Sequence, residues 1–64
     1  MKVNGKTIVL ENNLSLSGFL EENQYDARLI AVERNGEIVP RSTYGNVVLE
    51  DEDILEIVSF VGGG

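Results

Sequence analysis

Hydrophobic and polar residues alternate along the first ten positions of the chain. The apolar members of this segment that we place on one face are Met1, Val3, Ile8 and Leu10. The dipeptide Asn4-Gly5 interrupts the alternation and favours a two-residue type I′ turn, because both turn positions need positive φ. We therefore predict a hairpin with Val3 opposite Lys6 and Met1 opposite Ile8, and with its apolar face toward the core.

A helical spacing follows the break at Asn12-Asn13. Its apolar positions are Leu16, Phe19 and Leu20, while Glu21 and Glu22 are expected to face water. Ser15 is the predicted N-cap, and Asn23 is expected to end the helix in a left-handed conformation. Gly18 costs about 1 kcal/mol relative to alanine inside a helix, so we expect it to permit close packing of helix on sheet or to be tolerated.

A second hairpin is predicted from residue 29 to residue 39, with its turn at Asn35-Gly36. The register places Arg34 opposite Glu37 as a charge pair and Val32 opposite Val39 as an apolar pair. Pro40 lacks a backbone N–H, so the strand should finish there at a sheet edge or turn.

The remaining third of the chain predicts a turn, an acidic segment and a strand. Residues 42–46 are turn-like with Tyr44 as anchor, and Leu49 returns to the core. The acidic run of residues 50–53 is most simply a solvated turn; its consecutive spacing lacks the alternating ligands of a calcium loop, and a role in steering a basic partner is the alternative. Residues 54–58 form the strongest strand.

The order of predicted elements indicates a two-layer α+β fold. Leu55 and Ile57 fall on one face of the last strand, and Ile54, Glu56 and Val58 on the other. Apolar residues on both faces suggest a central strand. We expect it to run parallel beside the first strand, joined by a right-handed crossover, with one helix on one face of the sheet.

Composition narrows the possible functions. The 64 residues contain 5 Lys and Arg against 11 Asp and Glu, with no Cys and no His, so the core must be stable without disulfides or the usual zinc ligands. Without thiol or imidazole, nucleophilic catalysis and histidine acid/base chemistry lack their main groups, and an enzyme is not expected.

Charge and hydropathy also bear on partners and location. A net charge of -6 disfavours binding to phosphate backbones and favours a basic protein partner. No apolar run is long enough to span a bilayer, and no leader precedes the first strand, so we expect a cytoplasmic protein without membrane association. A monomer is the default expectation.

The last three residues are Gly62, Gly63 and Gly64. Three terminal glycines are compatible with a flexible end or a cloning remnant, but here they directly follow a core strand. Residues without side chains let an extended backbone enter a narrow cleft, and three residues reach about 10 Å. We therefore divide the chain into a domain over residues 1–61 and a flexible tail over residues 62–64.

Three segments resemble one known family. They are Asn35-Gly36-Glu37-Ile38-Val39-Pro40-Arg41, the strand from Asp53 to Val58, and the ending Val61-Gly62-Gly63-Gly64. Together they resemble the ThiS sulfur carriers of thiamin thiazole biosynthesis, within the ubiquitin-like β-grasp superfamily. The chain departs from that family at Glu52, where glycine is common, and at Tyr44, where tryptophan is frequent.

The resemblance implies a mixed sheet of about five strands and a carrier chemistry. An ATP- and Mg-dependent, ThiF-like adenylating enzyme would activate the Gly64 carboxylate, and sulfur would then replace AMP to give a thiocarboxylate. A cysteine desulfurase would commonly supply the sulfur, and a ThiG-like thiazole synthase would receive it. Gly62 and Gly63 would thread into the partner, and the chain itself would hold no permanent cofactor.

An apolar patch beside the tail is the expected docking surface. Its residues are Ile54, Val58, Phe60 and Val61, although cover by neighbouring strands, or a purely structural role for Val61, is the alternative. Other functions stay open: a carrier that donates sulfur to molybdopterin or another acceptor, a ubiquitin-like modifier, or a binding module with an inert tail.

Overall fold

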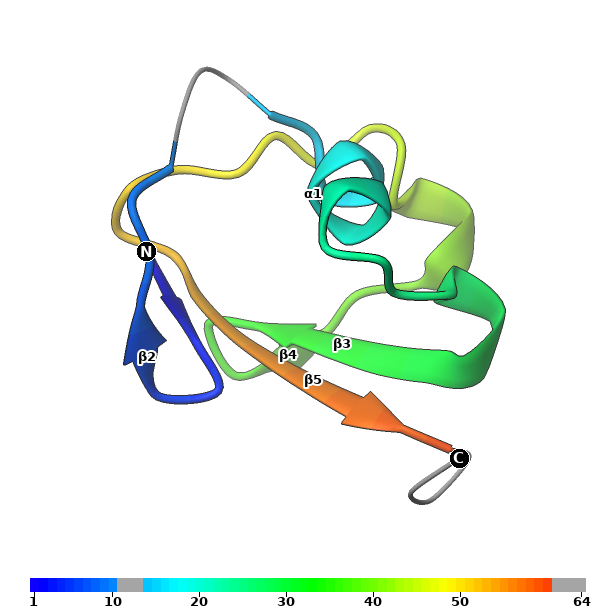
Figure 1. The fold of residues 1–64 in the computed structure, drawn as a ribbon. Helices are drawn as coiled ribbons and strands as arrows, with labels where there is room; N and C mark the ends of the chain where they lie inside the picture. The colour runs from blue at the N-terminus through cyan, green and yellow to red at the C-terminus, as the bar shows by residue number, and fades with distance from the viewer. Residues whose placement is uncertain (11–13, 61–64) are drawn as a thin grey trace.

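The computed structural model describes residues 1–10 and 14–60, which form a five-stranded mixed sheet with helical segments on one face (Figure 1). The strands are β1 (Lys2–Val3), β2 (Lys6–Thr7), β3 (Ile30–Arg34), β4 (Glu37–Ile38) and β5 (Ile54–Ser59). The helical elements are α1 (Leu16–Glu22) and two 3₁₀ helices, η1 (Ala27–Leu29) and η2 (Arg41–Thr43). Their order in the sheet is β2-β1-β5-β3-β4. The predicted two-layer α+β arrangement is confirmed.

Both hairpins have the predicted register. Val3 lies opposite Lys6, and the backbone N–H of Ile8 donates to the Met1 carbonyl at 2.8 Å. In the second hairpin Arg34 lies opposite Glu37, and Val39 donates to the carbonyl of Val32 at 2.9 Å. The turn residues have the positive φ of a type I′ turn: Asn4 50°, Gly5 85°, Asn35 53° and Gly36 87°.

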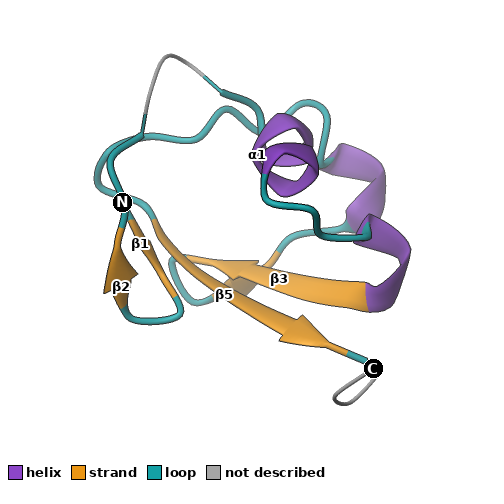
Figure 2. Cartoon of the chain, viewed as in Figure 1, coloured by secondary structure: helices purple, strands orange, loops and turns teal. Residues whose placement is uncertain are grey.

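β5 is the central strand, parallel to β1 and antiparallel to β3 (Figure 2). Lys2 lies opposite Ile54, as the predicted side-by-side arrangement requires. The reason given for a central position was wrong, however, because only one face of β5 is covered. Leu55 and Ile57 are buried under the helix layer, whereas Ile54, Glu56 and Val58 are exposed.

The helix begins and ends at the predicted residues, but its C-cap has a different conformation. Ser15 caps α1 by accepting the backbone N–H of Gly18 at 3.0 Å. Asn23 is the last capping residue but is not left-handed; Gln24 takes that conformation, with φ 64°. Asn23 instead donates its side-chain amide to the Phe19 carbonyl at 2.8 Å, which satisfies a carbonyl at the helix end.

Gly18 does not serve the packing of helix against sheet. A Cβ at this position would lie 3.0 Å from Leu14 Cδ1 and 3.2 Å from Ser15 Oγ. The glycine therefore makes room for the segment that enters the helix and for its cap, which corrects the expected packing role.

The core lies between α1 and the sheet. Its buried members are Met1, Val3, Leu16, Phe19, Leu20, Ile30, Val32, Tyr44, Leu49, Leu55 and Ile57. Ile8 and Leu10 are only partly buried at its margin. Arg41 fixes η2 to the beginning of β3, because its guanidinium donates to the carbonyls of Ala27 at 2.8 Å and Ile30 at 3.3 Å. This arginine of the Val39-Pro40-Arg41 motif therefore has a structural role.

Candidate functional site

The end of β5 presents an apolar strip to solvent beside the expected tail. Val58 is 60% exposed and Phe60 is 62% exposed, while the alternating residues Leu55 and Ile57 are buried. Ile54 is 51% exposed on the same outer face. The neighbouring strands do not cover these residues, so the structure brings Ile54, Val58 and Phe60 to one open face of the sheet. Val61, Gly62, Gly63 and Gly64 lie outside the described residues.

The register extends this face beyond β5. Val58 lies opposite Ala31 of β3, and the backbone N–H of Phe60 donates to the Leu29 carbonyl at 2.8 Å. Leu29 is half exposed, as is expected for a residue that pairs with Phe60 on the open side. The apolar strip is therefore two strands wide where the chain leaves the sheet.

Asp26 and Arg28 lie just before Leu29 in the sequence, the residue that pairs with Phe60 after the end of β5. The guanidinium donates to both carboxylate oxygens, with Nε 3.1 Å from Oδ1 and NH2 2.9 Å from Oδ2. The hydrogen bond from the Arg28 side chain, with that from its backbone N–H, lowers the pKa of Asp26 to about 2. The pair is exposed, so it orders the first turn of η1 locally and contributes little to stability.

The beginning of β5 is fixed by Asp53, which the sequence placed in a solvated turn. That prediction was wrong for this residue, because Asp53 is only 4% exposed. Its carboxylate accepts hydrogen bonds from Arg34 Nε at 2.9 Å, from the Asn35 side chain at 3.1 Å and from the Glu50 backbone N–H at 2.9 Å. Burial alone would raise the pKa of Asp53, but these donors and the Arg34 charge outweigh it and lower the pKa.

Arg34 corrects a second prediction. Although it lies opposite Glu37 in the register, its guanidinium is directed to Asp53 and, at 3.5 Å, to Glu50. The expected Arg34–Glu37 charge pair is therefore replaced by contacts with the acidic segment, because Arg34 and Leu55 lie opposite each other on the face that the segment approaches.

The two turn asparagines have a role that the sequence did not reveal. Asn4 accepts the backbone N–H of Ile57 at 2.7 Å and donates to its carbonyl at 3.2 Å. Asn35 accepts the backbone N–H of Ile54 at 3.0 Å. The turn after β1 and the turn after β3 thus each form hydrogen bonds to β5, which lies between these two strands. Local turn chemistry explains the choice of Asn-Gly without these bonds, so no sequence signal pointed to them.

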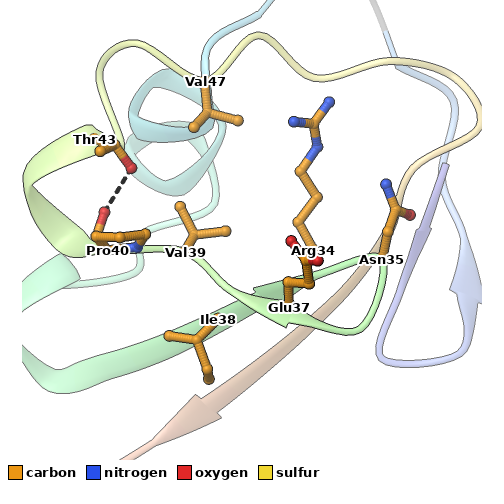
Figure 3. Close-up of a pocket in the computed structure, with 8 residues that line it drawn as sticks. All are labelled: Arg34, Asn35, Glu37, Ile38, Val39, Pro40, Thr43 and Val47. Carbon is orange, nitrogen blue, oxygen red and sulfur yellow. Dashed lines mark hydrogen bonds between the residues drawn. The ribbon is translucent and has the colours of Figure 1, made fainter.

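A shallow hollow lies between β4 and the loop that follows η2 (Figure 3). It has a volume of about 400 Å³ and is lined by Arg34, Asn35, Glu37, Ile38, Val39, Pro40, Thr43 and Val47. Figure 3 shows the Thr43 hydroxyl bonded to the Pro40 carbonyl, at 2.7 Å, on one wall. Arg34 lies opposite Leu55, and the Asn35 backbone N–H donates to the Ile54 carbonyl, so this side of the hollow lies near the start of β5.

Neither a metal cluster nor a membrane helix is found among the described residues. Residues 1–10 and 14–60 contain no group of three or more acidic, His or Cys side chains placed to hold a metal ion. No helix in the same ranges is long and apolar enough to cross a membrane.

Comparison with known proteins assigns the chain to a family. The family model described as the ThiS family matches residues 1–64. The chain belongs to the ThiS family. It is 37% identical over 65 residues to the sulfur carrier protein ThiS of Bacillus subtilis, and the match covers all of this chain and 98% of that one.

Structural similarity to the ThiS family extends to the whole described fold. The crystal structure of the thiamine biosynthesis protein ThiS from Geobacter metallireducens superposes with a TM-score of 0.82 at 30% identity, over 98% of this chain and 96% of that one. The predicted ubiquitin-like β-grasp fold is therefore confirmed.

Longer ThiS-like relatives are also found. The chain is 45% identical over 62 residues to a thiazole synthase of Paramagnetospirillum magneticum and 42% identical to one of Magnetococcus marinus. Each match covers 97% of this chain but 19% of the relative, so the chain spans about a fifth of the length of these synthases.

The two departures from the ThiS pattern are accommodated locally. Tyr44 is buried, so it keeps an aromatic ring in the core. Glu52 lies in a turn in which the Asp53 backbone N–H donates to the Glu50 carbonyl at 3.0 Å. Glu52 is not among the described non-glycine residues with positive φ, so this turn does not require glycine there.

Proposed function

We propose that this chain is a sulfur carrier of thiamin biosynthesis. The Gly64 carboxylate is a poor electrophile, because its charge resists attack and its oxygen is a poor leaving group. An E1-like adenylating enzyme attaches AMP to the carboxylate and releases pyrophosphate from ATP. Hydrosulfide, or a donor at the same oxidation level, then adds to the carbonyl carbon, and AMP leaves with the oxygen to give the thiocarboxylate.

The match of the ThiS family to the whole chain carries this proposal. The glycine ending supports it, because residues 62–64 form the narrow segment that an active-site cleft needs. The chain also contains no Cys, so no internal thiol competes for the activated carbonyl. The adenylating enzyme is proposed to use ATP with Mg, and the cytoplasm is the proposed location of the reaction.

Thiazole synthase is the proposed acceptor of the sulfur. Relatives named thiazole synthase contain a segment up to 45% identical to this chain, within a protein about five times its length. Two activities carried on one polypeptide commonly act in succession, which supports a reaction between the carrier and the synthase. The chain itself is then a protein substrate and not an enzyme.

The outer face of β5 is the proposed docking surface for the adenylating enzyme. Ile54, Val58 and Phe60 are exposed apolar residues on a rigid central strand, and Val61 is proposed to continue the surface toward the tail. Docking by this surface would hold the domain while Gly62 and Gly63 enter the active site. Apolar anchors of this kind commonly dominate protein interfaces.

Intact mass spectrometry tests the proposal. The chain is incubated with ATP, magnesium, sulfide and a ThiF-like adenylating enzyme that is active on another carrier. We expect a mass gain that corresponds to replacement of one oxygen by sulfur, and its loss in a variant without Gly64. Gly63→Ala should fold normally, by circular dichroism, and be adenylated much more slowly.

Three results would contradict parts of the proposal. An unchanged mass with the active enzyme would overturn the carrier function. Normal turnover of Gly63→Ala would overturn the threading role of the tail, and a thiocarboxylate that molybdopterin synthase but not thiazole synthase consumes would reassign the acceptor.

A further inference from the structure

The open face of the sheet carries two carboxylates directly opposite each other. Glu33 of β3 pairs in register with Glu56 of β5, and both residues are exposed. Cross-strand neighbours have Cβ atoms about 5 Å apart, and like charges at this spacing destabilise a sheet. The free protein therefore maintains an unfavourable contact at the centre of this face.

No described side chain neutralises the pair. The ion pairs between described residues are Arg28 with Asp26 and Arg34 with both Glu50 and Asp53. Lys2 is the basic residue that register places on the same face, opposite Ile54, and it forms no ion pair with either carboxylate. Both carboxylates are thus available to a partner.

Exposed apolar residues border the two glutamates. Ile38 of β4 lies opposite Glu33 on its other side and is 65% exposed. Ile54 and Val58 precede and follow Glu56 on the outer face of β5. A partner side chain that reached the carboxylates would therefore be surrounded by apolar surface, where exclusion of water strengthens an ionic contact.

We infer that Glu33 and Glu56 receive a cationic side chain of the adenylating enzyme, which docks on this sheet face with apolar residues around that cation. An arginine fits this position well, because its planar guanidinium donates to two carboxylates at once, whereas a lysine offers a single point charge. The inference rests on the proposed function and adds the chemistry of the partner surface. The net charge of -6 favours the same type of partner.

The test combines binding with stability, because the two should change in opposite directions. In the double variant Glu33→Gln with Glu56→Gln, the like-charge contact is removed, so we expect the urea midpoint of the free protein to rise. We expect the KM of the adenylating enzyme for this variant to rise about tenfold, because both carboxylates that contact the enzyme's cationic side chain are lost. The kcat should stay unchanged, because the reacting carboxylate belongs to Gly64 and neither glutamate takes part in the reaction.

A matched control separates contact from general attraction. Glu21→Gln with Glu22→Gln removes the same charge from exposed positions on α1, in the opposite layer. Its KM should change about twofold or less, because distant exposed charges are screened by salt. Raising the salt concentration should increase the wild-type KM more than that of the Glu33/Glu56 variant.

The outcomes distinguish this inference from the function on which it rests. Equal KM changes in the two double variants, with normal adenylation of the wild type, would overturn the cation contact and leave the carrier function intact. Absence of adenylation in the wild type would overturn both. A lower urea midpoint in the Glu33/Glu56 variant would show that the pair supports the fold, which also contradicts the inference.

Discussion

The carboxylate of Asp53 joins three parts of the chain that are separate in sequence. Arg34 and Asn35 reach it from the second hairpin, and the Glu50 backbone N–H reaches it from the acidic turn. A buried carboxylate is stable only with such partners. At the scale of single residues, this side chain holds the segment that leads into β5, the strand whose outer face is proposed to dock.

Asp53→Asn should lower the free energy of unfolding by about 2 kcal/mol at neutral pH, because the charged acceptor of a partly buried ion pair is lost. The pKa of Asp53 is lower in the folded chain than the value of 3.8 for an unperturbed group. Its contribution is therefore complete above that value and is lost as the pH falls through the lower folded pKa. Urea unfolding followed by circular dichroism between neutral and acidic pH measures both effects.

The control for this prediction is Asp51→Asn, which removes the same charge from the same acidic run at an exposed position. Its unfolding free energy should stay close to that of the wild type. The wild type should lose stability as the pH falls below the pKa of a free carboxyl group, and Asp53→Asn should lose less. If the variant lost as much stability as the wild type over this pH range, the role assigned to Asp53 would be wrong.

Among the secondary structure elements, β5 is bonded by both hairpin turns as well as by its strand neighbours. Asn4 bonds to β5 at Leu55 through its backbone N–H and at Ile57 through its side chain. Asn35 bonds at Ile54 through both its backbone N–H and its side chain. β1 ends at Val3, so the Asn4 amide continues the hydrogen bonding of β5 where the paired strand has stopped.

Asn4→Gly isolates this side-chain contribution, because glycine keeps the positive φ that the turn requires. Two hydrogen bonds to Ile57 are lost, so the free energy of unfolding should fall by about 2 kcal/mol. Native-state hydrogen exchange should show faster exchange at the Ile57 amide, while the Val39 amide in the other hairpin follows only the global change in stability. Unaltered exchange at Ile57 would contradict this account.

The sequence predicts the elements that depend on local chemistry. Both hairpin registers follow from Asn-Gly turns, and the N-cap follows from Ser15 before an apolar helical spacing. The exposed strip on β5 follows from its period of two, and the docking role proposed for it follows from the resemblance to a family. These features need no knowledge of which distant residues meet.

Most of the features that were missed depend on contacts between distant segments. Arg34 prefers Asp53 to the adjacent Glu37 because the acidic turn folds over the same face, and that approach is set by the tertiary structure. The opposition of Glu33 and Glu56 depends on the register of β3 against β5, which no turn connects. One miss is local: the helix ends at Asn23 as predicted, but the left-handed residue is Gln24.

At the scale of the whole molecule, the two faces of the sheet have different tasks. The face under α1 holds the fold together, and the outer face leaves Ile54, Val58 and Phe60 in solvent along β5 and just after it. Successive side chains of β5 point to opposite faces of the sheet. One set of alternate residues therefore affects stability, and the other set affects the proposed docking.

Phe60→Ser and Leu55→Ala test this division. Phe60 is 62% exposed, so its substitution should change the free energy of unfolding by about 0.5 kcal/mol or less and raise the KM of the adenylating enzyme about tenfold. Leu55 is fully buried, so Leu55→Ala should lower the free energy of unfolding by about 3 kcal/mol. Urea unfolding and pyrophosphate release give the two quantities, and an unchanged KM for Phe60→Ser would contradict the assigned docking role.

The central position of β5 also determines the order of events during synthesis. Within residues 1–10 and 14–60, the two hairpins share no ladder with each other, and each joins the sheet through residues 54–59. An isolated hairpin is only marginally stable in water. A nascent chain that lacks β5 therefore has two hairpins that are not joined in one sheet. Folding must therefore follow translation of β5 and its release from the ribosome. The tail that we propose to accept sulfur is then presented only by a domain that has already closed.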